Sequence, residues 1–354
     1  MNILTPLQQQ ALCDALLCEK IINIEPMQSL WAGKGELVRL TLQLNNDISF
    51  TPKTCSVVVK KIDFQAGSEH PYGWHSTFSE QRKRKSYQVE FNWYRQFGEK
   101  LNARNTGAIA MSAMYFPKLV YSESSEQGMI LALEDLAPNF PQRFTLGKDD
   151  RPSHRQIKSC IRWLTLLHAK TLSFPVSGLW AVGGYWHLET RPDEWQAITD
   201  LTLKRAAKAI DERLRLSPYQ CIIHGDAKLA NFCFSECNEH AAAVDFQYVG
   251  QGPGVKDLML LLSSVMPDTR LQLEASSFVD FYFKQLRIAL AHFQPQVNAN
   301  DVIANWRSLY PMAWADFHRF LTGWKPGHWK IGGYCKQQTD IALSALSQSA
   351  DGWG

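Results

Sequence analysis

Apolar and polar residues alternate in the first third of the chain. Leucines occupy every second position from 40 to 44 within 37-LVRLTLQL-44, which is the period of a half-buried strand. In 55-CSVVVKKI-62 the apolar residues are β-branched and nearly continuous, so we predict a strand that is buried on both faces as far as Lys60. The apolar segment 129-MILALED-135 ends in two carboxylates and is predicted as a third strand.

A helical period dominates the rest of the chain. The polar segment 66–81 is predicted as a loop that leads into a helix near 84–100. The segment 139–152 contains prolines towards both ends and is predicted as a linker. From Ile157 to His168, apolar residues recur at spacings of three and four, the pattern of an amphipathic helix. Further helix-like stretches lie at 197–216, 257–266, 276–291 and 337–348.

These patterns predict an α+β fold with two lobes. The 354 residues exceed the ~150 of an average domain, so each lobe can bury a core of its own. We expect a small antiparallel β-sheet with one key helix in residues 1–134. A larger and mainly helical lobe is expected in residues 135–354.

Bulk charge argues against two classes of partner. The formal net charge is only +3, which indicates neither a nucleic-acid platform nor a membrane-surface protein. The basic run 82-RKRK-85 is predicted to be a solvated helix start. Nowhere do ~18 consecutive apolar residues predict a transmembrane helix, and the first residues lack the pattern of a signal peptide. We therefore expect neither a nucleic-acid partner nor a membrane.

The eight cysteines are scattered along the chain, which indicates reduced thiols and a cytoplasmic location. Cys233, Cys237 and His240 lie close together in the sequence. No second ligand pair at zinc-site spacing follows them, so a zinc site is not predicted. The sequence leaves the oligomeric state open.

The stretch 221-CIIHGDAKLANF-232 leads a strand-like segment into a cluster of polar residues that a core strand does not need. A tight loop there turns Asp226 and Asn231 towards one small space. Asp245 follows a second apolar strand, 241-AAAV-244. We predict that the two strands form a hairpin with ~10–15 residues between them, which presents both aspartates at one edge. Such an edge suits a magnesium–phosphate site, because Mg²⁺ prefers oxygen ligands.

The string HGD-x-x-x-x-N, followed by a strand and D-F, resembles the catalytic loop and metal-binding aspartate of the aminoglycoside phosphotransferase and choline kinase superfamily, relatives of protein kinases. Two features resemble its ecdysteroid-kinase-like branch: the segment HPYGWHSTFSEQRKRKSYQVEFNWY, and DFQ in place of DFG. The resemblance extends from about residue 28 to about residue 335. It implies a bilobal, protein-kinase-like fold that uses ATP and Mg²⁺.

The resemblance implies roles for the loop residues. Asp226 would take the proton of a substrate hydroxyl as catalytic base, and Asn231 and Asp245 would hold Mg²⁺ against the nucleotide phosphates. Lys228 would act near the transferring phosphoryl group, although most antibiotic kinases of the superfamily lack this lysine. His224 is expected to orient the loop by hydrogen bonding. A role for His224 as general base is the minor alternative, because Asp226 already fills that position.

The first lobe is expected to hold the nucleotide. Lys60 matches the strand lysine that reaches the α- and β-phosphates in the family, and Glu90 is placed on the predicted helix to pair with it. The alternative is that Lys60 and Glu90 are unrelated surface charges. Because strand side chains alternate, Lys61 is expected to point to solvent.

The resemblance also implies that two backbone segments contact the nucleotide. Gly33 and Gly35 in WAGKGE would let a hairpin approach the phosphates, although a plain turn has the same composition. The backbone from Glu134 to Leu136 is expected to be the hinge that binds adenine. Asp257 resembles the family's buried aspartate that steadies the catalytic loop, and a helix-start carboxylate is the alternative.

The aromatic tail 306–330 corresponds to the acceptor side of the family. Aromatic residues at helical spacing are most often core, yet Trp314, Trp324 and Trp329 would also suit a bulky apolar alcohol or a quaternary ammonium bound by cation–π contact. Residues 255–354 hold eight acidic and nine basic residues, so no acidic surplus awaits an aminoglycoside. Asp316 and His318 could contact an acceptor hydroxyl.

The sequence thus predicts a kinase that phosphorylates the hydroxyl of a small, bulky or apolar molecule. A choline- or aminoglycoside-type kinase is the alternative within the superfamily. A catalytically silent nucleotide-binding protein on the same fold is a second alternative. A metal-dependent hydrolase that uses Asp226, His224 and Asp245 is a third, and it leaves Lys60 and Glu90 unexplained.

Overall fold

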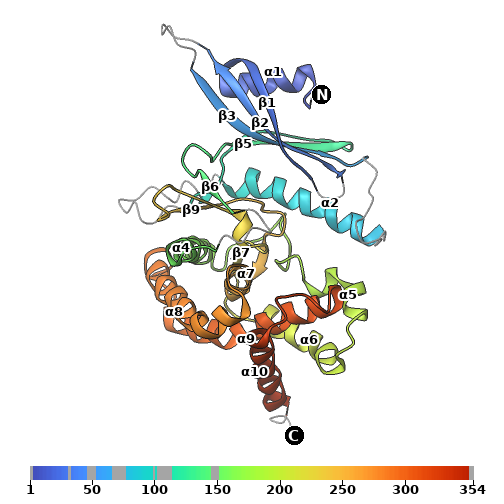
Figure 1. Cartoon of the computed structure of the whole chain (residues 1–354), viewed down its shortest axis with the longest axis vertical. Helices are drawn as coiled ribbons and strands as arrows, with labels where there is room; N and C mark the ends of the chain where they lie inside the picture. Colours follow the sequence, from blue (N-terminus) through green and yellow to red (C-terminus); the bar gives the residue numbers. More distant parts are fainter. Residues whose placement is uncertain are drawn as a thin grey trace. The chain divides into compact units, whose positions relative to one another are not determined.

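The computed structural model describes residues 3–30, 33–45, 53–65, 77–98, 100–101, 114–144 and 151–350. The described residues cluster into two compact units (Figure 1). Unit 1 comprises the described parts of Met1–Arg104 together with Phe116–Asn139. Unit 2 comprises the described parts of Asn105–Tyr115 and of Phe140–Gly354. The predicted α+β class, with an antiparallel sheet followed by a helical region, is confirmed.

Unit 1 is built on a five-stranded antiparallel sheet with the order β1-β2-β3-β5-β4. Its strands are β1 (Cys18–Ser29), β2 (Gly35–Leu44), β3 (Thr54–Asp63), β4 (Leu119–Ser124) and β5 (Gly128–Glu134). The alternation predicted for β2 is present, since Leu40 and Leu42 are fully buried while the residues between them are half-exposed. The predictions of strands at β2, β3 and β5 are confirmed.

Helices cover both faces of this sheet. Helix α1 (Pro6–Leu16) packs with Val57 and Val59 of β3 in one core. Helix α2 (Thr77–Asn92), which continues as a π-helical turn at Trp93–Gly98, supplies Glu90 to the side chain of Lys60. Since neighbouring strand residues point to opposite faces, α1 and α2 lie on opposite sides of the sheet, as Figure 1 shows.

Three predictions for this region are wrong or incomplete. Lys61 does not point to solvent, because it is half-buried under the N-terminal segment and donates a hydrogen bond to the Ile3 carbonyl at 2.7 Å. Helix α2 begins at Thr77, earlier than the predicted start near residue 84. The early start was missed because the first residues of the helix are polar and show no apolar period. Most of the predicted loop, residues 66–76, lies outside the described residues.

Strand β1 was not predicted from the sequence. Its register with β2 shifts at three places, between Cys18 and Lys20, between Ile21 and Asn23, and between Pro26 and Gln28. Each shift is an irregularity that turns the following side chains to the other face. The period of two is therefore lost in the sequence, although the pairing is continuous enough to form a strand.

Unit 2 is mainly helical. Its long helices are α4 (His154–Lys170), α6 (Leu201–Arg215), α7 (Val255–Val265), α8 (Asp268–Phe293), α9 (Ala299–Trp324) and α10 (Gly333–Ala350), with the short α5 (Pro192–Gln196) before α6. Ser153 and Gln156 form a capping box at the start of α4. Helices α4 and α8 lie side by side, and α9 packs against α6, α7, α8 and α10 (Figure 1).

The helices predicted for unit 2 are confirmed, although their ends are shifted. The bounds of α9 were not predicted from the apolar period. Its apolar residues are so numerous that no single stripe marks it, and sixteen of its residues are buried. Pro311 lies inside it. A helix buried on most of its surface carries little amphipathic signal.

Two small sheets complete unit 2. Strand β7 (Cys221–Ile223) pairs with β10 (Gly250–Gly252), and β8 (Phe232–Phe234) pairs with β6 (Gln142–Arg143) and β9 (Ala241–Ala243). The predicted hairpin between the strand before His224 and the strand 241–244 is therefore wrong. The short strand β8 between them pairs with β9, because only the short loop 235–240 separates these two strands.

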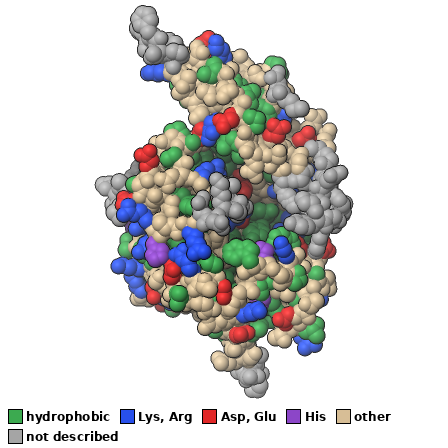
Figure 2. All heavy atoms as spheres, in the orientation of Figure 1, with side chains coloured by type: hydrophobic (Ala, Val, Ile, Leu, Met, Phe, Trp, Pro, Cys, Tyr) green, Lys and Arg blue, Asp and Glu red, His purple; other side chains and the backbone are tan. Residues whose placement is uncertain are grey.

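The surface carries mixed charge. On the face drawn in Figure 2, acidic and basic side chains are interspersed and neither sign gathers into one large patch. No described helix combines the length and the apolar composition that crossing a bilayer requires. All eight cysteines are free thiols.

Candidate active site

The loop from β7 to β8 holds most of the predicted catalytic residues, and it is buried. His224 is fully buried. Its Nδ1 accepts a hydrogen bond from the Asp226 backbone N–H at 3.3 Å, and its Nε2 lies 3.1 Å from the Val244 carbonyl oxygen. This pairing places the ring proton on Nε2. Because both ring nitrogens are engaged, His224 is placed to orient the loop and not to accept a proton from a ligand.

Asp257, in the first turn of α7, braces the same loop. Its Oδ2 accepts hydrogen bonds from the His224 N–H at 2.6 Å and from His168 Nε2 at 3.1 Å. Its Oδ1 accepts one from the Gly225 N–H at 2.9 Å. The carboxylate is fully buried, so the sequence interpretation as a loop-steadying aspartate fits this geometry better than a plain helix-start carboxylate does.

Gly225 is required by both conformation and space. Its φ is +74°, in the left-handed region that favours glycine. A Cβ at this position would lie 2.0 Å from the Tyr248 carbonyl oxygen. The loop can therefore pass this close to the segment after β9 only with glycine here.

The carboxylate of Asp226 is 3% exposed, and its two oxygens differ in environment. Oδ2 accepts hydrogen bonds from Lys228 Nζ at 2.7 Å and from Asn231 Nδ2 at 3.1 Å. Oδ1 is buried and has no hydrogen-bond partner in the part of the chain that the structure describes. Burial raises the pKa of Asp226, the Lys228 ammonium lowers it, and the negative charge of Asp245 raises it again.

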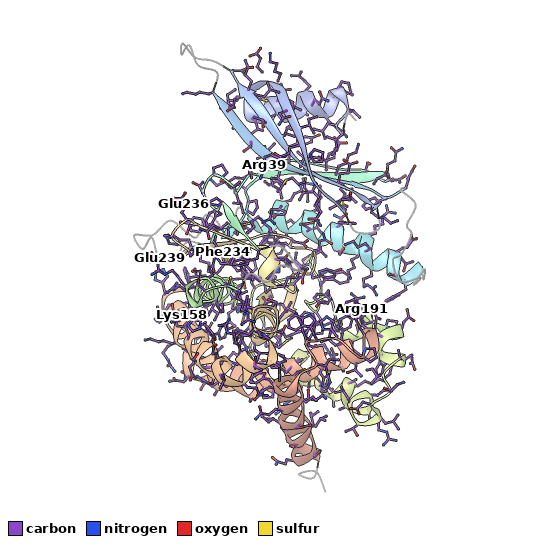
Figure 3. All side chains as sticks on the ribbon, viewed as in Figure 1. Arg39, Lys158, Arg191, Phe234, Glu236 and Glu239 are labelled. Atoms are coloured by element: carbon purple, nitrogen blue, oxygen red, sulfur yellow. The ribbon has the colours of Figure 1, made fainter. Side chains whose placement is uncertain are left out.

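The hairpin of β8 and β9 brings Asn231 and Asp245 together at its open end. Phe232 pairs with Ala243, and the Val244 N–H donates to the Asn231 carbonyl at 2.9 Å. Glu236 and Glu239 mark the opposite end of this hairpin in Figure 3. The Asn231 amide turns its nitrogen to Asp226, with bonds to the carbonyl and to Oδ2. Its oxygen therefore faces the other way.

Asp245 has a positive φ of 68° although it is not a glycine. Such a conformation costs of order 1–3 kcal/mol and persists where surrounding contacts impose it, often at functional sites. A carboxylate and an amide oxygen are ligands that Mg²⁺ prefers, and two protein ligands leave places for phosphate and water. Asn231 and Asp245 therefore fit a magnesium ion. Among the described residues no group of three or more His, Cys, Asp or Glu could hold a metal.

In unit 1, the ion pair expected between Lys60 and Glu90 is present. Lys60 Nζ lies 2.6 Å from Glu90 Oε2, and the two side chains are 8% and 2% exposed. Lys60 also lies over the Tyr87 ring, with 5.7 Å from Nζ to the ring centroid. The alternative of two unrelated surface charges is excluded by this burial and contact.

The predicted hinge follows β5 and is tied to the sheet. The Glu134 N–H donates to the Lys118 carbonyl at 2.9 Å. Asp135 accepts hydrogen bonds from Arg39 Nε at 2.7 Å and from Ser56 Oγ at 2.8 Å. Arg39 is labelled on β2 in Figure 3. Burial raises the pKa of Asp135, and the hydrogen bonds from Arg39, the Ala137 N–H and Ser56 together outweigh it and lower that pKa. The bond from the Ala137 N–H fixes the backbone that follows β5.

Of the two glycines of WAGKGE, Gly33 lies in the turn before β2 and Gly35 is the first residue of that strand. The Leu30 N–H donates to the Gly35 carbonyl at 2.8 Å, and the Gly33 N–H donates to the Leu30 carbonyl at 3.1 Å. A Cβ on Gly35 would lie 2.0 Å from the Lys61 carbonyl oxygen, whereas one on Gly33 would meet nothing within 4 Å. Packing against β3 therefore explains Gly35 without any ligand.

The residues predicted for the acceptor side divide into buried and exposed ones. Trp314 is fully buried, and Asp316 is 1% exposed. Asp316 Oδ1 accepts from the Arg319 guanidinium at 2.7 Å, and Oδ2 accepts from Trp186 Nε1 at 2.8 Å. Both oxygens are thus engaged inside the helical core, which leaves no surface for a ligand.

His318 is also engaged in the core. Its Nδ1 lies 3.0 Å from Thr339 Oγ1, and burial lowers its pKa. Trp324 and Trp329 differ from these residues, because they are 40% and 59% exposed. Of the predicted acceptor residues, only these two tryptophans present substantial surface.

Two residues near Asp226 were missed in the sequence. The negative charge of Asp226 contributes, after burial, to raising the pKa of Tyr185. Lys330, in the segment between α9 and α10, interacts electrostatically with Asp226 and Lys228. Neither residue belongs to a motif, and only the packing of unit 2 brings them to the catalytic loop.

One protein-family model matches part of this chain. Residues 144–290 match the model of the phosphotransferase enzyme family, APH. The resemblance to the aminoglycoside phosphotransferase and choline kinase superfamily is confirmed. The matched APH segment contains the catalytic loop, Asp245 and Asp257. The ecdysteroid-kinase-like branch stays a prediction.

Solved structures similar to this chain include two kinases of amino alcohols. An ethanolamine kinase from Plasmodium vivax is 12% identical, with a TM-score of 0.41 over 92% of this chain and 84% of that one. A choline kinase from Cryptosporidium parvum Iowa II is 10% identical, with a TM-score of 0.44 over 94% and 89%. An aminoglycoside-3′-phosphotransferase of type VIII is 13% identical, with a TM-score of 0.38 over 86% and 98%. No curated protein sequence matches the chain.

Proposed function

We propose that this protein is an ATP- and Mg²⁺-dependent phosphotransferase that moves the γ-phosphoryl group to the hydroxyl of a small molecule, with Asp226 as catalytic base. The observation that carries the proposal is the divided environment of the Asp226 carboxylate. Lys228 and Asn231 hold Oδ2, while Oδ1 is buried and without a hydrogen-bond partner among the described residues. A buried acceptor in this state fits the O–H of a bound ligand.

The acceptor hydroxyl would donate its proton to Asp226 Oδ1 as its oxygen forms a bond to the γ-phosphorus and the bond to the β-phosphate oxygen breaks. Burial raises the pKa of Asp226, which makes it a better base than an exposed aspartate. The Lys228 ammonium, 2.7 Å from Oδ2, lies where it can stabilise charge on the transferring group. His224 and Asp257 keep the loop in this conformation.

Each unit supplies residues with a proposed role toward the nucleotide. Lys60 would bind the α- and β-phosphates in an orientation fixed by Glu90, and the backbone from Glu134 to Leu136 would bind adenine. Asn231 and Asp245 would hold Mg²⁺, which supplies positive charge to the phosphates when it is bound. We assign the nucleotide grip to residues 1–134 and catalysis to residues 135–354, with Gly33 and Gly35 as a supporting turn.

For the acceptor, we retain Trp324 and Trp329 as contacts and add Tyr185. Trp314 and Asp316 are not retained, because their side chains are enclosed in the core. The proposed partner is a small-molecule alcohol, and the proposed location is cytoplasmic.

The test is phosphotransfer by wild type and by the Asp226→Asn variant, with Mg²⁺ and ATP labelled in the γ-phosphate. The variant should bind nucleotide as wild type does. Its rate of phosphate transfer over a panel of alcohols should be lower than that of wild type by about a thousandfold or more. Transfer by the variant within tenfold of wild type would refute the assigned base. Nucleotide binding by wild type without any turnover would favour the catalytically silent protein, and activity without ATP would favour the hydrolase.

A further inference from the structure

A second ammonium group lies beside the catalytic loop. Lys330 Nζ lies 3.3 Å from Ser263 Oγ of α7. The neighbouring Ser264 Oγ accepts a hydrogen bond from the Leu229 N–H at 3.0 Å. One turn of α7 thus holds both the Lys330 side chain and the loop that carries Asp226 and Lys228.

The aromatic rings around Lys330 already have cations of the protein on them. Lys330 Nζ lies 5.5 Å from the ring centroids of both Phe317 and Trp329. The Arg191 guanidinium lies 5.2 Å from the Phe320 centroid. Arg191, labelled in Figure 3, is fixed by a hydrogen bond from its Nε to the Tyr185 carbonyl at 2.6 Å.

Neighbouring rings stack on some of the other ring faces. Phe320 and Trp324 are stacked with 5.8 Å between centroids, and His328 and Trp329 are stacked with 5.9 Å. A cationic ligand that approached these rings would share them with the charges of Lys330 and Arg191. It would also meet the positive charges of Lys228 and Lys330.

The ammonium of Lys330 retains capacity for a ligand. An ammonium has three donors, and the described contact to Ser263 uses one. Its charge is opposed by Lys228 and by burial, which together outweigh the attraction of Asp226 and lower the pKa of Lys330 to about 8. A nearby anion would relieve both unfavourable effects.

Resting on the proposed function, we infer that the acceptor is an alcohol that carries an acidic group, and that Lys330 binds this group while Asp226 takes the proton of the hydroxyl. Carboxylates and phosphates share the required chemistry, a negatively charged oxygen. The apolar part of the acceptor would lie against the exposed rings of Trp324 and Trp329. Cationic alcohols, such as quaternary ammonium compounds, are excluded by the same charges.

Three aromatic alcohols that differ mainly in charge test this inference: para-(hydroxymethyl)benzoate, para-methylbenzyl alcohol and para-(hydroxymethyl)phenyltrimethylammonium. Their binding to the full chain is followed by tryptophan fluorescence, in the presence of Mg²⁺ and a non-hydrolysable ATP analogue. The acidic probe should bind about tenfold or more tightly than the neutral one, and the cationic probe more weakly than both. Equal binding of the acidic and neutral probes, or tighter binding of the cation, would overturn the inference.

Substitutions of Lys330 test whether this residue binds the acidic group. Lys330→Met should reduce affinity for the acidic probe by about ten- to a hundredfold and should reduce the difference between the acidic and neutral probes to little or nothing. Lys330→Arg should restore much of that difference. Lys325→Met removes an exposed lysine of the same segment and should leave the preference unchanged. A Lys330→Met protein that still prefers the acidic probe as wild type does would contradict the assignment.

The same samples separate this inference from the proposed function. Transfer of the labelled γ-phosphoryl group from ATP over the panel of alcohols reports phosphotransfer independently of probe binding. If transfer to every alcohol is absent while the acidic probe binds best and depends on Lys330, the phosphotransferase proposal fails and the anion site stands. If transfer depends on Asp226 while the probes bind alike, the phosphotransferase stands and the acidic acceptor is rejected.

Discussion

Gly225 and Asp257 are joined by a hydrogen bond of 2.9 Å from the glycine N–H to Oδ1 of the carboxylate. The other oxygen of Asp257 accepts from the His224 N–H at 2.6 Å. One buried carboxylate therefore satisfies two successive N–H groups of the loop that ends in Asp226. The position of Asp226, the proposed catalytic base, therefore depends on a residue of α7 that is far from it in sequence.

Substitution Asp257→Asn should destabilise the protein and slow phosphotransfer together. The amide presents an NH₂ group where the carboxylate accepted bonds from backbone donors, so the unfolding free energy should fall by about 3 kcal/mol. Denaturant titration measures this change. Asp280→Asn is the matched control, because Asp280 is 68% exposed in a surface ion pair and should change stability by less than about 0.5 kcal/mol. Equal effects of the two substitutions would reject the bracing role.

The Lys60 and Glu90 pair should separate stability from activity. Lys60→Met removes the ammonium that lies 2.6 Å from Glu90 and should lower the unfolding free energy by about 3–5 kcal/mol, because a buried carboxylate loses its countercharge. Adding Glu90→Gln should recover most of that stability. Phosphotransfer should stay reduced by about a hundredfold or more in the double variant, since the phosphates lose a positive charge.

The double variant is informative because stability and phosphotransfer can recover independently of each other. Recovery of both stability and phosphotransfer in the double variant would show that Lys60 and Glu90 serve the fold of unit 1 alone. Circular dichroism with denaturant and a labelled-ATP assay on the same preparations distinguish the cases.

The binding of an acidic acceptor should depend on pH through Lys330. Its pKa is lowered to about 8, so the ammonium is present below that pH and is lost above it. The KM for para-(hydroxymethyl)benzoate should therefore rise as pH increases through about 8, while the KM for the neutral alcohol should not follow it. His328 does not share this range, because burial and the charges of Lys330 and Lys325 lower its pKa to about 4.

Two other charged groups face Lys330, namely Asp226 and Lys228. Asp226 attracts the ammonium and Lys228 repels it, and the pKa of Lys228 is itself raised by Asp226 and Asp245. Lys228 therefore stays charged through the pH range in which Lys330 titrates. A KM that rises equally for both alcohols would point to a change in the catalytic loop and would contradict the role of Lys330.

Much of the fold could be predicted because local patterns coincide with burial. Leu40 and Leu42 point to one core, and the apolar residues of α4 recur at helical spacing because one face of that helix is buried. Strand β1 could not be predicted in this way, since its bulges break the period. Helix α9 could not be delimited, since it is buried on most sides.

The loop that carries Asp226 could be located from the sequence because its residues are close together and their spacing is specific. The pairing of the strands around this loop could not be predicted. Strand β7 pairs with β10, and the residues between them include the separate hairpin of β8 and β9. Lys330 belongs to no motif. Its placement follows from contacts with Ser263 and Phe317, which are distant in sequence and become neighbours only when α7 and α9 pack.

The central claim is that Asn231 and Asp245 hold the divalent ion of a nucleotide complex beside Asp226. Manganese can report on it, because its electron paramagnetic resonance signal distinguishes free from bound ion. With a non-hydrolysable ATP analogue present, Asp245→Asn should weaken binding of Mn²⁺ by about tenfold or more, while Glu239→Gln, at the other end of the same hairpin (Figure 3), should leave it unchanged. Wild-type affinity in the Asp245→Asn protein would contradict the account.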